Sequence, residues 1–321
     1  MSVKEYKSDL LQRYWAFRKS HFANDQSFFD SQYIEPTSPP VFKRNEAWRN
    51  VIVNPDASEK EKRELLGLIP NGEWHKWYGS MNSSQALAQS VLGNLSVYGF
   101  LDCLSEIKDD DGLDLFGKAK ISSDNFEMEH KVNHLNEPRP TSLDGYISGE
   151  YQVAIECKFT EPEVGTCSRP RLRQTDSNYE REHCDGSYSV QRPRKEYCSL
   201  TEIGVLYWEY VPKLFNWQRD RDYKPLCPLN KNYQLVRNIL AIGVKNEIAF
   251  PDNGYVVLIY DERNPAFQEN GDGLNAYIET KLALIMPTML RKCSWQKIVS
   301  HLRAQNMLPW LMENLNLKYG F

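Results

Sequence analysis

The sequence predicts an α/β or α+β protein, in which a β-sheet is flanked by helices and further helices lie at both ends of the chain. Two observations indicate this fold class. Helical and extended patterns follow one another in the order helix, three strands, helix, strand, and residues 253–261 form an apolar run typical of a buried strand. There is also no internal repeat, which argues against a repeat protein.

Local patterns give each element in turn. Residues 1–25 place apolar side chains on one side of a helix, and a Pro-rich turn at 36–40 interrupts the chain. A charged helix over 58–68 begins at an Asp or Ser cap, and Leu87, Val91 and Leu95 recur at helical spacing in 82–95. The remaining expected elements are an extended run at 126–135, a hairpin at 141–159, helices at 198–206 and 232–244, the strand at 253–261, and helices at 274–284, 294–305 and 308–314.

Length and composition indicate an ordinary globular protein. Its 321 residues suit one large domain or two small ones, with 41% hydrophobic and 26% charged residues. We interpret 1–321 as a single domain, made of an N-terminal helical extension (1–70), a core (71–262) with an irregular insertion (162–230), and C-terminal helices (263–321). No apolar run approaches the ~20 residues that cross a bilayer, and the N-terminus lacks a signal-peptide pattern. The expected location is the cytoplasm, without a membrane partner.

The hairpin at 141–159 is the most informative segment of the sequence. Two extended runs are joined by a turn at about 148–150. In the second run, every other residue from Val153 to Phe159 points to one face, whereas Glu156 and Lys158 point to the other. Folding the pair about the turn brings Asp144 close to the level of Glu156. An Asp, a Glu and a Lys are then expected together at the end of a mostly apolar hairpin.

This grouping is suited to metal-assisted hydrolysis of a phosphodiester. Two carboxylates bind a hard cation through oxygen, and an ammonium group orients the attacking water or offsets developing negative charge. Glu-x-Lys occurs five times in the chain, but only Glu156 and Lys158 combine it with a β-prone strand and an Asp on the preceding arm. The alternative is a surface hairpin whose Glu and Lys form an ordinary ion pair.

Asp144, Glu156, Cys157 and Lys158 resemble the Asp…Glu-x-Lys motif of the PD-(D/E)xK nuclease superfamily, although Leu143 replaces the usual Pro before the Asp. This resemblance implies a restriction-endonuclease-like core, a central mixed β-sheet flanked by helices. It also implies that Asp144, Glu156 and the Cys157 carbonyl hold Mg²⁺, for which Mn²⁺ can substitute, and that Lys158 assists cleavage of DNA.

Three segments are also similar to a bacterial family of restriction endonuclease-like proteins, namely 83–87, 140–144 and 155–161, and the similarity runs with gaps from about 74 to 260. A role in restriction, in defence or in DNA repair is what these resemblances imply. Two other classes stay open, a nucleic-acid-binding module of the same fold that does not cut, and a protein-interaction domain. A homodimer and an RNA substrate also stay open.

Four further polar residues are candidates for the site. Glu129 can supply another carboxylate, or it is a solvated residue of an alternating strand. Gln85 can orient a phosphate or a water, or serve with its serine neighbours at a helix surface or cap. Gln234 and Arg237 lie one turn apart on the 232–244 helix, where nucleases place a helix beside the active site; plain solvation of that helix is the favoured interpretation.

The net charge is −4, so nucleic-acid binding requires a local excess of positive charge. Residues 169–195 carry seven basic and four acidic residues, a local charge of +3 immediately after the candidate strand. As a group these residues are predicted to contact phosphates, and the alternative is a solvated loop of mixed charge. The basic residues are Arg169, Arg171, Arg173, Arg181, Arg192, Arg194 and Lys195.

The seven cysteines are expected to be reduced in the cytoplasm. Four of them, Cys167, Cys184, Cys198 and Cys227, fall in the irregular insertion. Some nucleases of the superfamily carry a four-Cys iron–sulfur cluster, and zinc is a second option for such a set. Because no Cys-x-x-Cys pair exists here, buried free thiols are the favoured interpretation.

Overall fold

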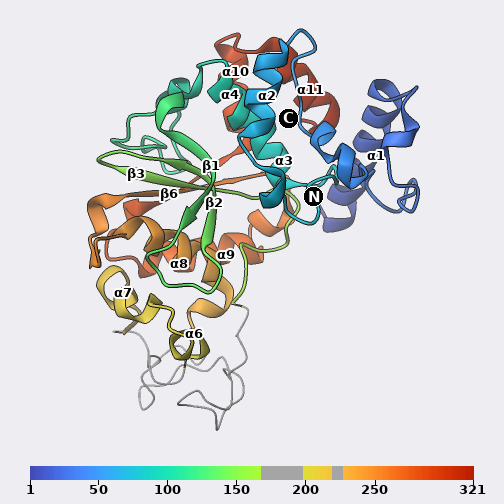
Figure 1. Ribbon diagram of the computed structural model, residues 1–321. Coiled ribbons are helices and arrows are strands. Elements are labelled where there is room, and N and C mark those ends of the chain that lie inside the picture. Colours follow the sequence, from blue (N-terminus) through green and yellow to red (C-terminus); the bar gives the residue numbers. More distant parts are fainter. Residues whose placement is uncertain (168–197, 219–226) are drawn as a thin grey trace.

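A five-stranded mixed sheet lies at the centre of the computed structural model, which describes residues 1–167, 198–218 and 227–321 (Figure 1). The strand order is β1-β2-β3-β6-β7, with β1 to β3 antiparallel and β3, β6 and β7 parallel. This mixed α/β architecture confirms the predicted fold class. The strands are β1 Phe126–Val132, β2 Thr141–Ile147, β3 Gln152–Cys157, β6 Gly254–Tyr260 and β7 Leu290–Ser294.

Burial along the strands follows the sequence patterns. Strand β6, which lies between β3 and β7, is buried along its whole length, as its continuous apolar run predicts. In β3, the predicted alternation is confirmed, because Val153 and Ile155 belong to the hydrophobic cluster on one face of the sheet and Ala154 to the cluster on the other. Glu156, two residues after Ala154, therefore faces the second cluster.

Helices cover both faces of the sheet (Figure 1). The first cluster packs the sheet against one group of helices, and the second cluster packs it against another. The first group contains α3 Ser84–Ala88, α4 Asn94–Val97, α10 Trp295–Ala304 and α11 Pro309–Tyr319. The second group contains α7 Tyr207–Leu214, α8 Leu229–Gly243 and α9 Asp272–Ala283.

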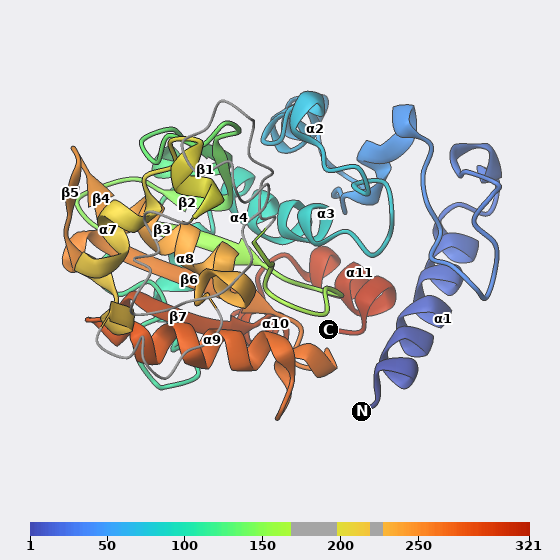
Figure 2. The same cartoon turned by 90° about the horizontal axis from the view of Figure 1, so that it is seen from below.

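The two ends of the chain meet in space. Helix α1 (Val3–His21) packs against α11, and Figure 2 shows α1 beside the C-terminus. Helix α1 begins with a capping box formed by Ser2 and Glu5, and α11 has Pro309 at its first position. Buried residues of α1 share the first hydrophobic cluster with the sheet. The N-terminal extension is therefore part of the core that supports β3.

Several elements differ from the prediction. The helix expected at 82–95 consists of α3, a π-helical stretch Gln89–Gly93 and α4, and its side chains are buried nearly all round rather than on one face. The helix expected at 198–206 is the short α6 Ser199–Glu202. Strand β7 was not predicted, because Arg291 and Lys292 mask its buried positions, and α7 was not predicted because it contains Pro212.

Further described elements are α2 Glu59–Gly67 and a small antiparallel pair, β4 Val244–Lys245 and β5 Ile248–Ala249. The helices expected near 58–68, 232–244, 274–284, 294–305 and 308–314 are confirmed, within a few residues at their ends except for α11, which extends to Tyr319. Across the described ranges, no helix has the length and apolar character needed to span a membrane.

Tyr6 of α1 supports the backbone next to Lys158. Its hydroxyl lies 3.0 Å from the Phe159 carbonyl oxygen and 3.1 Å from Oδ2 of the buried Asp261, and it can donate to either. We expect Tyr6→Phe to lower the free energy of unfolding by about 1–2 kcal/mol in urea titrations, because the buried hydrogen bond of this hydroxyl is lost. Tyr14→Phe is the matched control, since the buried Tyr14 hydroxyl has no hydrogen-bond partner among the described residues. Equal effects of the two changes would contradict this role of Tyr6.

Candidate active site

Three carboxylates lie at one level across three neighbouring strands. Gly145 of β2 pairs with Ile155 of β3, so the preceding Asp144 is level with Glu156. On the other side of β2, the pairs on either side of Glu129 are Met128 with Gly145 and His130 with Leu143, which places Glu129 opposite Asp144. The predicted proximity of Asp144 and Glu156 is therefore confirmed, and Glu129 joins them.

The backbone of β1 turns Glu129 out of the regular ladder. Its φ of 53° lies in the left-handed region, which non-glycine residues rarely adopt. The Glu129 carboxylate accepts hydrogen bonds from Ser142 Oγ and Gln85 Nε2, each at 2.5 Å. Local strain of this kind is often found at functional sites, where the surrounding structure holds it. Glu129 is half-buried, and each of its carboxylate oxygens accepts a hydrogen bond from a side chain that lines the pocket.

Asp144 is held against the end of β3. Its Oδ2 accepts a hydrogen bond of 2.6 Å from the backbone N–H of Cys157. Burial raises the pKa of the Asp144 carboxyl well above its ordinary value, and the negative charges of Glu156 and Glu129 raise it further. The charge of Lys158 acts in the opposite direction and lowers this pKa, but it does not outweigh burial and the two carboxylates.

Glu156 and Lys158 form a buried ion pair at 2.8 Å between Oε1 and Nζ. Helix α8 completes the pair, because Gln234 Nε2 donates to Oε1 of Glu156 at 2.6 Å and Asn238 Nδ2 donates to Oε2 at 2.7 Å. The Lys158 ammonium also donates to Gln234 Oε1 at 2.9 Å. Every oxygen of the Glu156 carboxylate thus has a donor, which a buried carboxylate requires.

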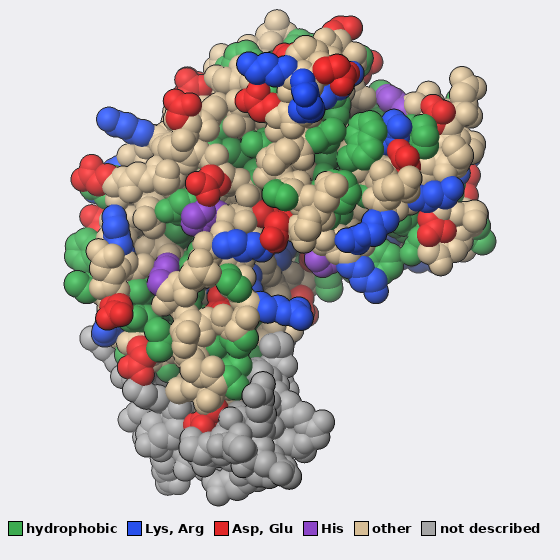
Figure 3. Space-filling view, viewed as in Figure 1, with side chains coloured by type: hydrophobic (Ala, Val, Ile, Leu, Met, Phe, Trp, Pro, Cys, Tyr) green, Lys and Arg blue, Asp and Glu red, His purple; other side chains and the backbone are tan. Residues whose placement is uncertain are grey.

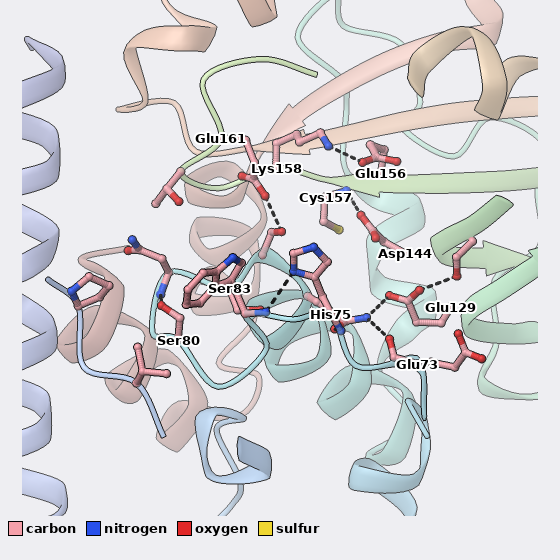
Figure 4. Close-up of a pocket in the computed structure, with 18 of the residues that line it drawn as sticks. Glu73, His75, Ser80, Ser83, Glu129, Asp144, Glu156, Cys157, Lys158 and Glu161 are labelled. Carbon is pink, nitrogen blue, oxygen red and sulfur yellow. Dashed lines mark hydrogen bonds and ion pairs between the residues drawn. The ribbon is translucent and has the colours of Figure 1, made fainter. Parts of the chain in front are cut away.

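Neighbouring carboxylates favour the protonated, positively charged form of Lys158. Burial lowers the pKa of the ammonium group, but Glu156, Glu161 and Asp144 outweigh burial, so the pKa lies above its ordinary value. Figure 4 shows Lys158 directed at Glu156, with Asp144 and Glu129 along the same side of the pocket. The ammonium group is therefore positioned to act as a fixed positive charge.

Helix α8 contributes more than the sequence suggested. Gln234 and Asn238 are four residues apart, so their side chains leave the same face of the helix and reach one carboxylate. The favoured interpretation of Gln234 as a solvated residue was wrong, and Asn238 was not singled out. Arg237 instead lies 5.7 Å from the centre of the Tyr233 ring. The Gln-x-x-x-Asn spacing on a buried helix was the available signal.

These groups open into a pocket of about 780 Å³. One wall is the sheet end with Glu129, Asp144 and Glu156, and the facing wall comes from the segments 33–41 and 73–85. Figure 4 shows His75 and Ser83 on that facing wall. Apart from Gln85, these segments were not predicted as part of the site, since nothing local in them marks a contact with the strands of the sheet.

Gln85 joins the two walls. Its Oε1 accepts from the backbone N–H of His75 at 2.9 Å, and its Nε2 donates to Glu129. Ser83 caps α3 by accepting from the Ala86 N–H, and Ser84 donates to Glu161 Oε1 at 2.6 Å. The structure therefore places Ser83 at the helix cap and Gln85 in the pocket beside Glu129, and the predicted role of Gln85 toward a phosphate or a water stays a prediction. Glu161, which the sequence did not single out, also lines the pocket.

The donor set fits a hard divalent cation. Asp144 and Glu156 place carboxylate oxygens at one level, and a bound cation would relieve the repulsion between their charges. Burial, and then the charges of Asp144 and Glu156, raise the pKa of the Cys157 thiol, so its carbonyl rather than its sulfur suits such an ion. Among the residues the structure describes, no three His, Cys, Asp or Glu side chains are arranged as a metal-binding group.

Two predicted groups lie partly or wholly outside the described residues. The basic stretch 169–195, with all of its predicted phosphate contacts, is one of them. The set of four cysteines is the other, because Cys184 lies outside the described residues. Cys167, Cys198 and Cys227 pack with the second hydrophobic cluster. No disulfide joins the described cysteines. The question of a metal at the four cysteines is therefore untested.

Charge on the described surface is mixed. On the face drawn in Figure 3, acidic and basic side chains are interspersed and do not gather into one broad basic patch. Among the described residues that line it, the pocket has five carboxylates, Glu73, Glu129, Asp144, Glu156 and Glu161, and two lysines, Lys131 and Lys158. A polyanion entering this pocket is opposed by its charge unless cations accompany it.

Comparison with known families places the chain among restriction endonucleases. Residues 11–320 match the model of a family described as "Restriction Endonuclease associating with ARP". Because the match covers nearly the whole chain, the protein belongs to this family. The family description implies an enzyme that cuts DNA. No curated protein and no solved structure matches the chain.

Proposed function

We propose that this protein is a Mg²⁺-dependent endonuclease that hydrolyses phosphodiester bonds of DNA, with Asp144, Glu156 and Lys158 as its active site. The observation that carries the proposal is the alignment of Glu129, Asp144 and Glu156 at one level of the sheet, with the Lys158 ammonium 2.8 Å from Glu156. We further propose that the five-stranded sheet and its helices are a restriction-endonuclease-like core of the PD-(D/E)xK type. Residues 1–321 then form a single nuclease-like domain.

Asp144, Glu156 and the Cys157 carbonyl would hold the cation, which is Mg²⁺ or, in its place, Mn²⁺. Such a cation polarises the scissile phosphate and lowers the pKa of a bound water. Glu129 lies opposite Asp144 and can supply a further carboxylate. A divalent charge is also what these carboxylates lack, since burial and the neighbouring charges of Glu156 and Glu129 raise the pKa of Asp144.

The other side chains of the site would orient the reacting groups and stabilise the negative charge that develops during cleavage. The Lys158 ammonium positions the attacking water or offsets the negative charge that develops on the phosphate. Gln234 and Asn238 fix both oxygens of Glu156, so its carboxylate does not need to reorganise during the reaction. Gln85 holds Glu129 in its left-handed conformation through a hydrogen bond.

The partners follow from the same proposal. DNA is the proposed substrate, with phosphate contacts from Arg169, Arg171, Arg173, Arg192, Arg194 and Lys195. The family description names an association with ARP, and we propose a partner of that name for this chain. An RNA substrate and a homodimer remain options of the proposal.

Plasmid cleavage tests the proposed function. The full-length protein is incubated with supercoiled plasmid in Mg²⁺, Mn²⁺ or EDTA, beside Glu156→Gln and the control Glu127→Gln, whose carboxylate is exposed and pairs with His130. We expect cutting with either metal, none in EDTA, none by Glu156→Gln, and wild-type cutting by Glu127→Gln. Cutting in EDTA, or undiminished cutting by Glu156→Gln, would contradict the assignment. DNA binding without any cutting would favour the silent binding module.

A further inference from the structure

Two aromatic side chains stand on the pocket wall that faces the carboxylates. Trp77 is 43% exposed, and Tyr33 contacts it edge-to-face, with ring centres 6.4 Å apart and planes at 84°. Both line the same pocket as Asp144 and Glu156. A large exposed aromatic ring in a pocket provides a surface on which another planar group can stack.

This wall is tied to the carboxylates by direct hydrogen bonds. The backbone N–H of His75, two residues before Trp77, donates to Gln85, and Gln85 donates to Glu129. The His75 Nδ1 lies 3.4 Å from the N–H of Trp77 and accepts from it in one tautomer. Trp77 therefore belongs to a segment held in place relative to the carboxylates.

The charges that line the pocket determine which part of a nucleotide can lie against this aromatic wall. The carboxylates among the described lining residues repel phosphates, whereas Lys131, Lys158 or a bound cation would attract them. Lys131 is already paired with Glu73. An uncharged base escapes this repulsion, and every base has a face that stacks on an aromatic ring.

We propose that the pocket accepts an unstacked nucleotide, whose base lies against Trp77 and Tyr33 while its phosphate faces Asp144, Glu156 and Lys158. The inference rests on the proposed function and specifies its substrate class, which is DNA with unpaired bases at the point of cutting. In an intact duplex the bases are stacked on one another and do not reach this wall.

Oligonucleotide binding tests the proposal without cutting. A fluorescent single-stranded oligonucleotide, its duplex, and an abasic strand with the same phosphates are titrated with the full-length protein in EDTA, at about 0.15 M salt where charges are screened beyond about 8 Å. The wild-type protein is expected to bind the single strand more tightly than the duplex or the abasic strand. Fluorescence anisotropy gives each dissociation constant.

Variants locate the binding. We expect Trp77→Ala to weaken binding of the single strand about 10-fold, because the stacking of a base on the indole ring is lost, and to leave binding of the abasic strand unchanged. Trp77→Phe keeps most of the affinity, and Phe250→Ala, at a residue 55% exposed that does not line the pocket, has no effect. Equal affinity for single strand and duplex, no binding of either, or indifference to Trp77→Ala would overturn the proposal. Because cleavage is measured separately, failure of the nuclease function does not mimic these outcomes.

Discussion

Replacing Asp144 with Asn is expected to abolish metal-dependent cleavage and, at the same time, to raise the melting temperature of the metal-free protein. Burial and the charges of Glu156 and Glu129 disfavour the Asp144 carboxylate, so a neutral amide of the same shape relieves a cost to folding. The amide is a poor metal ligand, and we expect cleavage to fall by at least about 100-fold, since even residues behind metal ligands contribute 10- to 100-fold.

The gain in stability should depend on pH. The pKa of Asp144 is raised in the folded protein above the unfolded value of about 3.9, so the folded state binds more protons between these two pKa values. The stability of the metal-free wild type therefore falls, relative to Asp144→Asn, as the pH rises from about 4 to the raised folded pKa. Above that pKa the difference stays constant, and below about pH 4 it disappears.

Thermal unfolding with and without Mg²⁺ measures both effects. Mg²⁺ is expected to stabilise the wild type but not Asp144→Asn, because binding to the folded state raises stability by mass action. Asp124→Asn, which removes an exposed carboxylate outside the pocket, is the control and should respond to Mg²⁺ like the wild type. An equal Mg²⁺ response in Asp144→Asn would show that the cation binds elsewhere.

The strands of the site were predictable from sequence because their information is local. Alternation in 152–157 assigned Glu156 to one face and Ile155 to the other, and a short turn fixed Asp144 at the level of Glu156. The left-handed backbone at Glu129 was not predictable, because a Glu in an alternating strand gives no sign of a positive φ. Its side chain is turned by contacts with Ser142 and with Gln85, which is 44 residues away.

Contacts between distant segments account for the rest. Asn238 reaches Glu156 across 82 residues of sequence, and α8 reads locally as an ordinary buried helix. The aromatic wall at Trp77 meets the sheet only when the N-terminal segments pack on the first cluster. Strand β7 was not predicted because one of its buried residues, Arg291, is charged. The Arg291 guanidinium lies over the Tyr255 ring, 4.2 Å from its centre, and a local pattern of hydrophobicity does not indicate such a contact.

Lys158→Met is expected to have the largest effect on both folding and cleavage. It leaves the buried Glu156 carboxylate without its cation, and breaking one partner of a buried ion pair typically costs about 3–5 kcal/mol. Loss of the fixed charge beside the phosphate is expected to reduce cleavage about 10²–10³-fold. A drop in activity alone would therefore not separate chemistry from unfolding.

The double change Glu156→Gln with Lys158→Met makes that separation. Both charges are gone, and Gln234 and Asn238 can still hydrogen-bond to the amide introduced at position 156, so the free energy of unfolding in urea should return most of the way to the wild-type value. Cleavage should stay absent. If the losses of stability in the two single variants instead add up in the double variant, the two side chains are not energetically coupled. The ion pair would then not explain why they are stable when buried. A double variant that is stable but does not cleave DNA would show that Glu156 and Lys158 are needed for the reaction, because the protein folds without their charges.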